Sequence, residues 1–344
     1  MPAEWEPHEG TWIAWPHQRA DWPGKFAPIP WVYAEIVRHL HVHETVNILV
    51  NDAAAQQGVR RILKRAMVDR KRVRFRRLPT DRVWMRDYGP IFLIGLGGEK
   101  AYLDWRFNGW AKYDNWKKDD AIPFKLGKWL KLPSWKPVWN DKRVVLEGGS
   151  IEVNGQGLLL TTEECLLSEV QTRNPTLSRA DLEAVFERYL GVKKVLWLNQ
   201  GIVGDDTHGH IDDLARFVNP RTIVAVVEAN PADANYRLLQ ENLDRLQGMT
   251  DLEGRKLDIV PLPMPAPLIF DGQRLPASYA NFYIANNLVL VPTFNDANDR
   301  VALGILAEVF PERQVVGIHA VDLVWGLGTL HCLSQQEPWV APRS

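Results

Sequence analysis

Hydrophobic and polar positions follow two spacings that alternate along the whole chain, one typical of helices and the other typical of strands. Apolar residues three or four positions apart predict helices at 31–41, 52–67, 177–190 and 297–310. Short apolar runs between these segments predict strands at 45–50, 73–78 and 314–318. Helices and strands in alternation indicate an α/β protein.

Turn and capping residues mark the ends of several of these elements. Asp52 is suited to cap the helix at 52–67, and the third helix begins at Ser178, with Glu183 nearby, and ends at Gly191. Strands at 151–153 and 158–161 flank Asn-Gly-Gln-Gly, and strands at 279–284 and 288–292 flank Ala-Asn-Asn, which predicts two hairpins.

Hairpin, helix and strand recur in that order, although no residue-level repeat accompanies them. No Gly/Ser linker, charged tail or low-complexity block divides the chain. Residues 1–344 are therefore expected to form a single domain.

The overall charge excludes any attraction of the whole chain to nucleic acid or to an anionic membrane. Lys and Arg total 41 against 42 Asp and Glu, a net charge of −1. The basic run at 64–77 crosses a predicted helix, a turn and a strand, so a solvated surface is the favoured interpretation over a nucleic-acid patch. Two cysteines, no visible secretory signal and no apolar run of about 18 residues predict a soluble, cytoplasmic protein. Whether it forms a homo-oligomer is left open.

Tryptophan is unusually frequent, with 15 residues, and six of them lie at 105–139 among Lys, Asp, Gly and Pro. Aromatic and charged residues without periodicity predict a long structured loop that lines or covers a site.

Cys332 is the strongest candidate for chemistry. Most cysteines in such proteins are buried and inert, but Cys332 follows Gly326 and Gly328, adjoins His331 and precedes Ser-Gln-Gln, which predicts a polar, flexible context. A free thiol has a pKa of about 8.5, so nucleophilic use needs a positive neighbour or a cationic substrate. Cys165 has acidic neighbours and is interpreted as structural.

The segment 204–213 is the densest in functional residue types, with four aspartates around His208 and His210. If 209–213 is extended, His210 and Asp212 point to the same side, where the carboxylate could hold an acid/base histidine. A solvated acidic loop, a metal site and a carboxylate clamp for an organic cation all remain open.

Two further carboxylates stand in comparable positions. Asp87 follows Arg86 before a turn at Gly89-Pro90, and Glu147 follows an apolar run and precedes two glycines. Each is either a solvated turn residue or a site residue.

Taken together, these segments resemble the agmatine deiminases of the guanidine-modifying (pentein) superfamily, which are related to bacterial peptidylarginine deiminases. The matching segments follow one another in order along nearly the whole chain: Met-Pro-Ala-Glu-Trp-Glu-Pro-His-Glu (1–9), Asp-Trp-Arg-Phe-Asn-Gly-Trp (104–110), Glu-Gly-Gly-Ser (147–150), Leu-Thr-Thr-Glu-Glu-Cys-Leu (160–166), Arg-Asn-Pro (173–175), Gly-His-Ile-Asp (209–212) and His-Cys (331–332). The resemblance implies a five-bladed α/β propeller with pseudo-fivefold symmetry and a central site, which would account for the recurring element order.

The resemblance also assigns roles to residues of this chain. It implies that Cys332 is the nucleophile, that His210 is the general acid/base, and that Glu147 orients His210. Asp87 and Asp212 are expected to bind the guanidinium group. Further substrate contacts are expected from Asp206, Trp84 and Trp110.

The implied reaction hydrolyses agmatine to N-carbamoylputrescine and ammonia, a step of putrescine and polyamine biosynthesis. Thiolate attack on the guanidinium carbon gives a tetrahedral adduct, ammonia leaves, and water then releases the ureido product from a thiouronium. No metal and no organic cofactor is required.

Four positions depart from the family pattern close to the substrate: Tyr88, Asp213, Leu327 and Thr329. Deimination of arginine, a methylated arginine or a peptidyl arginine therefore stays open, as does an amidinotransferase. The same fold also serves a ribosome-binding factor, but pure binding needs no nucleophile. The acidic segment 205–213 favours agmatine, whose far end is an ammonium group.

Overall fold

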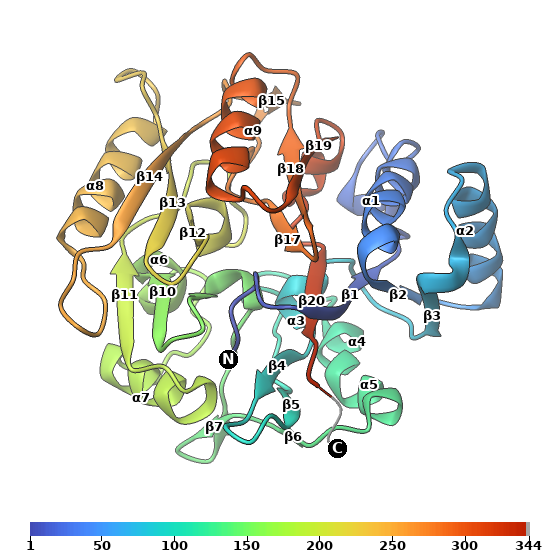
Figure 1. Ribbon diagram of the computed structural model, residues 1–344, viewed down its shortest axis with the longest axis horizontal. Coiled ribbons are helices and arrows are strands. Elements are labelled where there is room, and N and C mark those ends of the chain that lie inside the picture. Colours follow the sequence, from blue (N-terminus) through green and yellow to red (C-terminus); the bar gives the residue numbers. More distant parts are fainter. Residues whose placement is uncertain (342–344) are drawn as a thin grey trace.

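Five sheets of three or four strands lie around the centre of the computed structural model, which describes residues 1–341 (Figure 1). The four-stranded sheet has the order β20 (Ser334–Pro338), β1 (His8–Ala14), β2 (Thr45–Val50) and β3 (Val73–Arg77). The three-stranded sheets are β4 (Ile91–Ile94), β5 (Lys100–Leu103) and β6 (Ser134–Trp135); β9 (Glu152–Val153), β10 (Leu158–Thr162) and β11 (Lys194–Leu198); β12 (Ala215–Phe217), β13 (Thr222–Val227) and β14 (Asp258–Pro263); and β17 (Tyr283–Ala285), β18 (Leu288–Thr293) and β19 (Gln314–His319).

All five sheets share one pairing pattern. An antiparallel pair, such as β9 with β10, is followed by a parallel pair, such as β10 with β11. The same order holds in the sheets built on β5, β13, β18 and β1. Parallel neighbours need a crossover connection, which explains why helices separate these strands along the chain.

Helices make the crossover connections, and most of the longer ones lie on the outer side of the sheets (Figure 1). The crossover helices are α1 (Ile29–His43), α2 (Ala53–Arg65), α4 (Lys117–Asp120) and α5 (Ile122–Leu130), α6 (Glu163–Leu167) and α7 (Arg179–Leu190), α8 (Asn235–Gly248) and α9 (Asn298–Val309). The short helix α3 (Met85–Tyr88) precedes β4, and β7 (Val138–Trp139) with β8 (Lys142–Arg143) and β15 (Ile269–Phe270) with β16 (Gln273–Arg274) form small ribbons. No helix within residues 1–341 has both the length and the apolar character that crossing a membrane demands.

Most of the elements predicted from periodicity are confirmed. The strand at 45–50 has the predicted bounds, and the Asp52 side chain accepts a hydrogen bond from the Ala55 amide at 2.7 Å. Ser178 caps α7, but its reciprocal partner is Asp181 rather than Glu183, and Gly191 ends the helix with a φ of 73°. The basic run at 64–77 is largely exposed, as the solvated-surface interpretation requires.

The prediction of one long loop at 105–139 is wrong. This segment contains α4 and α5 and the strand β6, which pairs with β5. The apolar positions Ile122, Pro123 and Leu126 of α5 are buried. Trp116 directly before α4, Trp129 within α5 and Trp135 within β6 obscure the short helical period in the sequence.

Charged side chains from distant segments meet at a buried network around Glu4. Its carboxylate accepts hydrogen bonds from Arg86 at 3.0 Å, from Arg216 at 3.0 Å and from the Ile284 amide at 2.8 Å, and it lies 2.8 Å from His331. Burial alone would raise the pKa of Glu4, but the Arg216, His331 and Arg86 charges hold it well below its usual value. The network therefore joins the N-terminal segment to several sheets through charge.

Replacement of Arg216 by Met should be strongly destabilising. Arg216 is fully buried and pairs with both Glu4 and Glu152, so its loss leaves two buried carboxylates without their shared cation. We expect the free energy of unfolding to fall by about 3–5 kcal/mol, measured by urea denaturation. The control, Lys193→Met, breaks the exposed pair with Glu187 and should change it by less than about 1 kcal/mol. Equal urea midpoints for Arg216→Met and the unsubstituted protein would contradict this account.

Candidate active site

Short segments just before the first strand of each sheet supply the predicted site residues. Asp87 precedes β4, Glu147 precedes β9, His210 precedes β12 and Cys332 precedes β20. The strands of each sheet hold these segments at the centre of the molecule, so residues far apart in the chain become neighbours (Figure 1).

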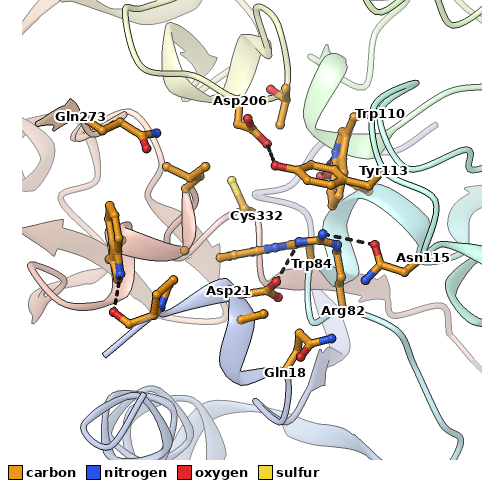
Figure 2. Close-up of a pocket in the computed structure, with 17 residues that line it drawn as sticks. Gln18, Asp21, Arg82, Trp84, Trp110, Tyr113, Asn115, Asp206, Gln273 and Cys332 are labelled. Carbon is orange, nitrogen blue, oxygen red and sulfur yellow. Dashed lines mark hydrogen bonds and ion pairs between the residues drawn. The ribbon is translucent and has the colours of Figure 1, made fainter. Parts of the chain in front are cut away.

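A cavity of about 380 Å³ opens onto Cys332. Figure 2 shows the Cys332 sulfur between the contact of Asp206 with Tyr113 on one side and the pair of Arg82 with Asp21 on the other. The cavity is also lined by Asp87, Trp84, Trp110, Asn115 and Leu327.

Cys332 has the polar neighbours that the sequence predicted, but it is buried. Only 6% of the residue is exposed, because its segment packs against Asn281, which donates a hydrogen bond from Nδ2 to Sγ at 3.0 Å. Burial, and then the charges of Asp212, Asp213 and Asp87, raise the pKa of the Cys332 thiol well above its usual value. The thiol is therefore protonated in the absence of a bound cation.

Asp87 and Asp212 flank the space next to this sulfur. The Oδ2 atom of Asp87 accepts a hydrogen bond from the Trp110 indole at 2.9 Å, and its Oδ1 atom accepts one from the Gly149 amide at 3.1 Å. Oδ2 of Asp212 lies 3.7 Å from Sγ of Cys332 and 2.7 Å from Nδ1 of His331. Two carboxylates within reach of a thiol can hold a planar cation over it.

The ionisation of the two carboxylates differs because their neighbours differ. Burial raises the pKa of Asp87 to about 6, against the opposing effect of the His210 charge. Burial acts on Asp212 in the same direction, but the hydrogen bond and charge of His331 lower its pKa below the usual value. Asp212 is therefore the more firmly ionised of the pair.

His210 lies among these carboxylates, although the backbone is not extended as expected. Residues Ile211–Asp213 form a short 3-10 helix instead of a strand. The turn still brings Nδ1 of His210 to 3.8 Å from Asp87 and 3.9 Å from Asp212. Burial alone would lower the pKa of His210, but Asp87, and then Cys165 and Glu147, hold it well above the usual value. The imidazole is thus poised as a cationic proton donor.

Glu147 lies on the opposite edge of the His210 ring. Its Oε2 atom is 3.8 Å from Nε2 of His210, and Arg173 donates a hydrogen bond from Nε to Oε1 at 3.1 Å. Burial would raise the pKa of Glu147, but the Arg173 charge and His210 lower it to about 2. A permanently ionised carboxylate behind the ring favours the imidazolium form.

Gly149 leaves room for this convergence. A Cβ atom on it would lie 2.6 Å from Nδ1 of His210 and 2.8 Å from Oδ1 of Asp87. Any side chain at this position would therefore push the acid/base candidate and the carboxylate out of place.

Asp206 lies at the rim of the cavity and is already engaged. It pairs with Lys112 and accepts a hydrogen bond from the Tyr113 hydroxyl at 2.6 Å. Trp84 and Trp110 line the cavity walls, and Trp84 packs against Trp22 at 5.8 Å between ring centroids. All eight predicted site residues thus meet around one cavity or directly behind it.

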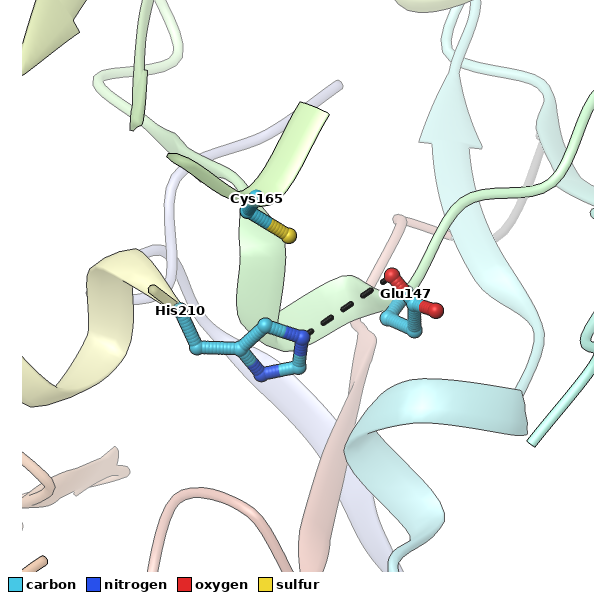
Figure 3. A group of neighbouring side chains, drawn as sticks. All are labelled: Glu147, Cys165 and His210. Atoms are coloured by element: carbon cyan, nitrogen blue, oxygen red, sulfur yellow. Dashed lines mark ion pairs between the residues drawn. The ribbon is translucent and has the colours of Figure 1, made fainter. Parts of the chain in front are cut away.

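Several residues of the site escaped the sequence analysis. Asn281 gave no signal, because it fell inside the strand predicted at 279–284, whereas the observed strand β17 begins only at Tyr283. Arg173 carried no assigned role. Cys165 is buried in a hydrophobic core, as its structural interpretation predicted, and it also lies beside His210 (Figure 3). Their partners stand far away in the chain, so spacing could not have found them.

Comparison with known proteins agrees with this geometry. Residues 1–338 match the model of a family described as Porphyromonas-type peptidyl-arginine deiminase. The agmatine deiminase of Pseudomonas aeruginosa (strain LESB58) is 35% identical over 366 residues, covering 100% of this chain and 96% of that protein.

Solved structures are similar over the same length. An agmatine deiminase of Enterococcus faecalis superposes with a TM-score of 0.90 at 34% identity, covering 98% of this chain and 95% of that one. A C. jejuni agmatine deiminase with substrate bound gives 0.88 at 31% identity, covering 99% and 96%. An amidinotransferase from Microseira wollei, 12% identical with a TM-score of 0.51, covers 98% and 96% and shares the fold.

The family match spans nearly all of the described chain, and the relatives exceed 30% identity along its whole length. The chain therefore belongs to the Porphyromonas-type peptidyl-arginine deiminase family, which confirms the resemblance to agmatine deiminases and bacterial peptidylarginine deiminases stated from its motifs.

Proposed function

We propose that this protein hydrolyses agmatine to N-carbamoylputrescine and ammonia through a covalent thiouronium on Cys332. The observation that carries the proposal is the cavity in which this sulfur lies beside Asp212 and close to Asp87, with His210 between the carboxylates and Glu147. Relatives of this chain at about one-third identity are named agmatine deiminases, and one was solved with its substrate bound.

Substrate binding activates the nucleophile. The guanidinium group of agmatine is planar and cationic, so Asp87 and Asp212 can accept its N–H hydrogen bonds and hold its carbon over Sγ. The thiol pKa of Cys332 is raised by burial and by three carboxylates. A bound cation offsets those charges and favours loss of the thiol proton. The site therefore selects positively charged substrates by chemistry as well as by fit.

Proton transfer falls to His210. The thiolate attacks the guanidinium carbon, and the imidazolium donates its proton to the departing nitrogen, so that ammonia leaves and a thiouronium remains. The neutral imidazole then takes one proton from water, whose oxygen attacks the same carbon. The C–S bond breaks to release the thiolate, and the second water proton passes to solvent as the ureido product forms. Glu147, ionised against Arg173, stabilises the imidazolium in both half-reactions.

The five sheets are inferred to be the blades of a five-bladed propeller with pseudo-fivefold symmetry in a single domain. The repeated pairing order and the site segments before β4, β9, β12, β17 and β20 support this arrangement. The proposal further places the enzyme in the cytoplasm, in polyamine synthesis, without a cofactor.

Deimination of a guanidine that carries a carboxylate is the second candidate, and Arg82 favours it. Its guanidinium lines the cavity, held by Asp21 at 2.8 Å and Asn115 at 3.2 Å, and stacks 4.1 Å from the centroid of the Tyr113 ring. A cation at this place suits the carboxylate of an arginine-like substrate, whereas Asp206 on the opposite side suits an ammonium group.

Purified protein should release ammonia from agmatine without added metal, and Cys332→Ser should abolish the release. Serine is a far weaker nucleophile than a thiolate, so no covalent intermediate forms. Ammonia and ureido product are measured for agmatine, arginine and a peptidyl arginine side by side. Turnover that survives Cys332→Ser would overturn the mechanism, and turnover of arginine alone would replace the substrate.

Asn281→Asp should lower kcat/KM by about 10- to 100-fold, because a hydrogen bond to a charged group contributes about 1.5–3 kcal/mol. Oδ1 of Asn281 accepts from the amide nitrogens of His331 and Cys332, which orients Nδ2 toward the sulfur. The Asp variant keeps that acceptor, loses the donor to the sulfur and to Oδ1 of Asp213, and places a second carboxyl beside the thiol, and each of these changes disfavours the thiolate. Alkylation of Cys332 by iodoacetamide should shift to higher pH in this variant, and an unshifted profile would contradict the assignment.

The value of kcat/KM should fall as the pH drops through about 6. Asp87 has its pKa raised to about 6 by burial, so below that pH it binds a proton and loses the charge that holds the guanidinium. The substrate stays cationic throughout this range. The measurement is kcat/KM for agmatine between pH 5 and 8. A flat profile on the acid side would show that Asp87 is not required in its ionised form.

A further inference from the structure

A second cysteine joins the acid/base histidine and its carboxylate in one buried group. Sγ of Cys165, a carboxylate oxygen of Glu147 and a ring nitrogen of His210 all lie within 4.8 Å of one another. Figure 3 shows the Cys165 sulfur and the Glu147 carboxylate on the same side of the imidazole ring. No other group of His, Cys, Asp and Glu within residues 1–341 converges in this way, including the His208–Asp213 segment by itself.

Two members of this group, Glu147 and His210, have buried polar atoms without a hydrogen-bond partner, and two of these atoms face one another. Oε1 of Glu147 accepts the hydrogen bond of Arg173, but Oε2 has no hydrogen-bond partner. Neither ring nitrogen of His210 has one, and Nε2 lies 3.8 Å from that free oxygen. Both residues are at most 1% exposed. Buried polar atoms without partners are unusual and call for a catalytic role, an ordered water or a bound ion.

We propose that Glu147, Cys165 and His210 form a site for a thiophilic divalent cation such as Zn²⁺, and that the bound ion inhibits the enzyme. A thiolate, an imidazole and a carboxylate are the three ligand types that zinc prefers. Bonds of about 2.0–2.3 Å require neighbouring ligand atoms to lie roughly 3.5 Å apart. Movements of less than about 1 Å by each side chain would bring the three ligand atoms to that separation. The fourth position is left for water.

Inhibition follows from what the ion displaces. A metal on Nε2 of His210 competes with the interaction between the ring and Glu147 and prevents the ring from carrying a proton between substrate and water. Arg173 repels the ion, whereas the carboxylates of Asp87 and Asp212 near Nδ1 attract it. Because all three ligands are buried behind the cavity, binding should develop slowly and be reversed by a chelator.

Cobalt binding tests the site without reference to activity. Co²⁺ replaces Zn²⁺, and a bound thiolate gives it a near-ultraviolet charge-transfer absorption. The Cys332→Ala protein, which lacks the competing nucleophile, should bind one equivalent of Co²⁺ with this band. Cys332→Ala/Cys165→Ser should lose the band. A band that persists in the double variant, or none in Cys332→Ala, would overturn the proposal.

A second experiment tests whether zinc bound at this site inhibits the enzyme. It rests on the proposed function, because inhibition is measured on agmatine hydrolysis. Ammonia release from agmatine is measured against Zn²⁺, with each variant compared with its own zinc-free rate. Cys165→Ala should raise the half-inhibitory concentration at least about tenfold, the effect that loss of even an outer-sphere partner has on metal affinity; Cys165→Ser repeats the test with a nearly isosteric residue. Equal half-inhibitory zinc concentrations for the unsubstituted protein, Cys165→Ala and Cys165→Ser would overturn the proposal and place the inhibitory zinc at Cys332 instead. If the metal-free protein releases no ammonia at all, the proposed function fails and the cobalt experiment still decides the site.

Discussion

The buried carboxylate of Glu4 holds together four segments that surround the candidate site. It binds Arg86 in α3, Arg216 on β12, the backbone of β17 and His331 next to Cys332. A buried carboxylate is stable only when cations and N–H donors surround it. Each partner therefore contacts the Glu4 carboxylate, and the elements that carry these partners meet around it. His331, held in this way, in turn holds Asp212 at 2.7 Å.

The site concentrates negative charge that its own surroundings only partly neutralise. Asp87, Glu147 and Asp212 are buried within a few ångströms of His210, and Arg173 and His331 neutralise two of them. Burial, and then the charges of Asp212, Asp213 and Asp87, raise the pKa of the thiol, and, although burial opposes it, the charge of Asp87 raises the pKa of the imidazole. Such a site is inert until a cation enters, since only then does the thiolate become favourable.

Much of the architecture could be predicted from local patterns, and some of it could not. The α2, α7 and α9 helices and the strands beside them follow from periodicity and caps, because these elements bury one face. The failure at 105–139 arose where tryptophans serve tertiary contacts, such as the indole of Trp110 on Asp87, and hide the period of α5. The segment at 209–213 was expected to be extended, but a 3-10 turn brings His210 and Asp212 together equally well.

The sequence by itself determined the residue types of the chemistry and the motifs that carry them: a cysteine, a histidine and several carboxylates whose order along the chain marks the family. The tertiary structure alone shows that Cys332 is buried, that Asn281 donates to its sulfur, and that Cys165 lies beside His210 at the edge of a hydrophobic core. The physical reason is distance along the chain. These neighbours belong to different sheets, and the pKa of each group depends on charges that periodicity and spacing cannot place.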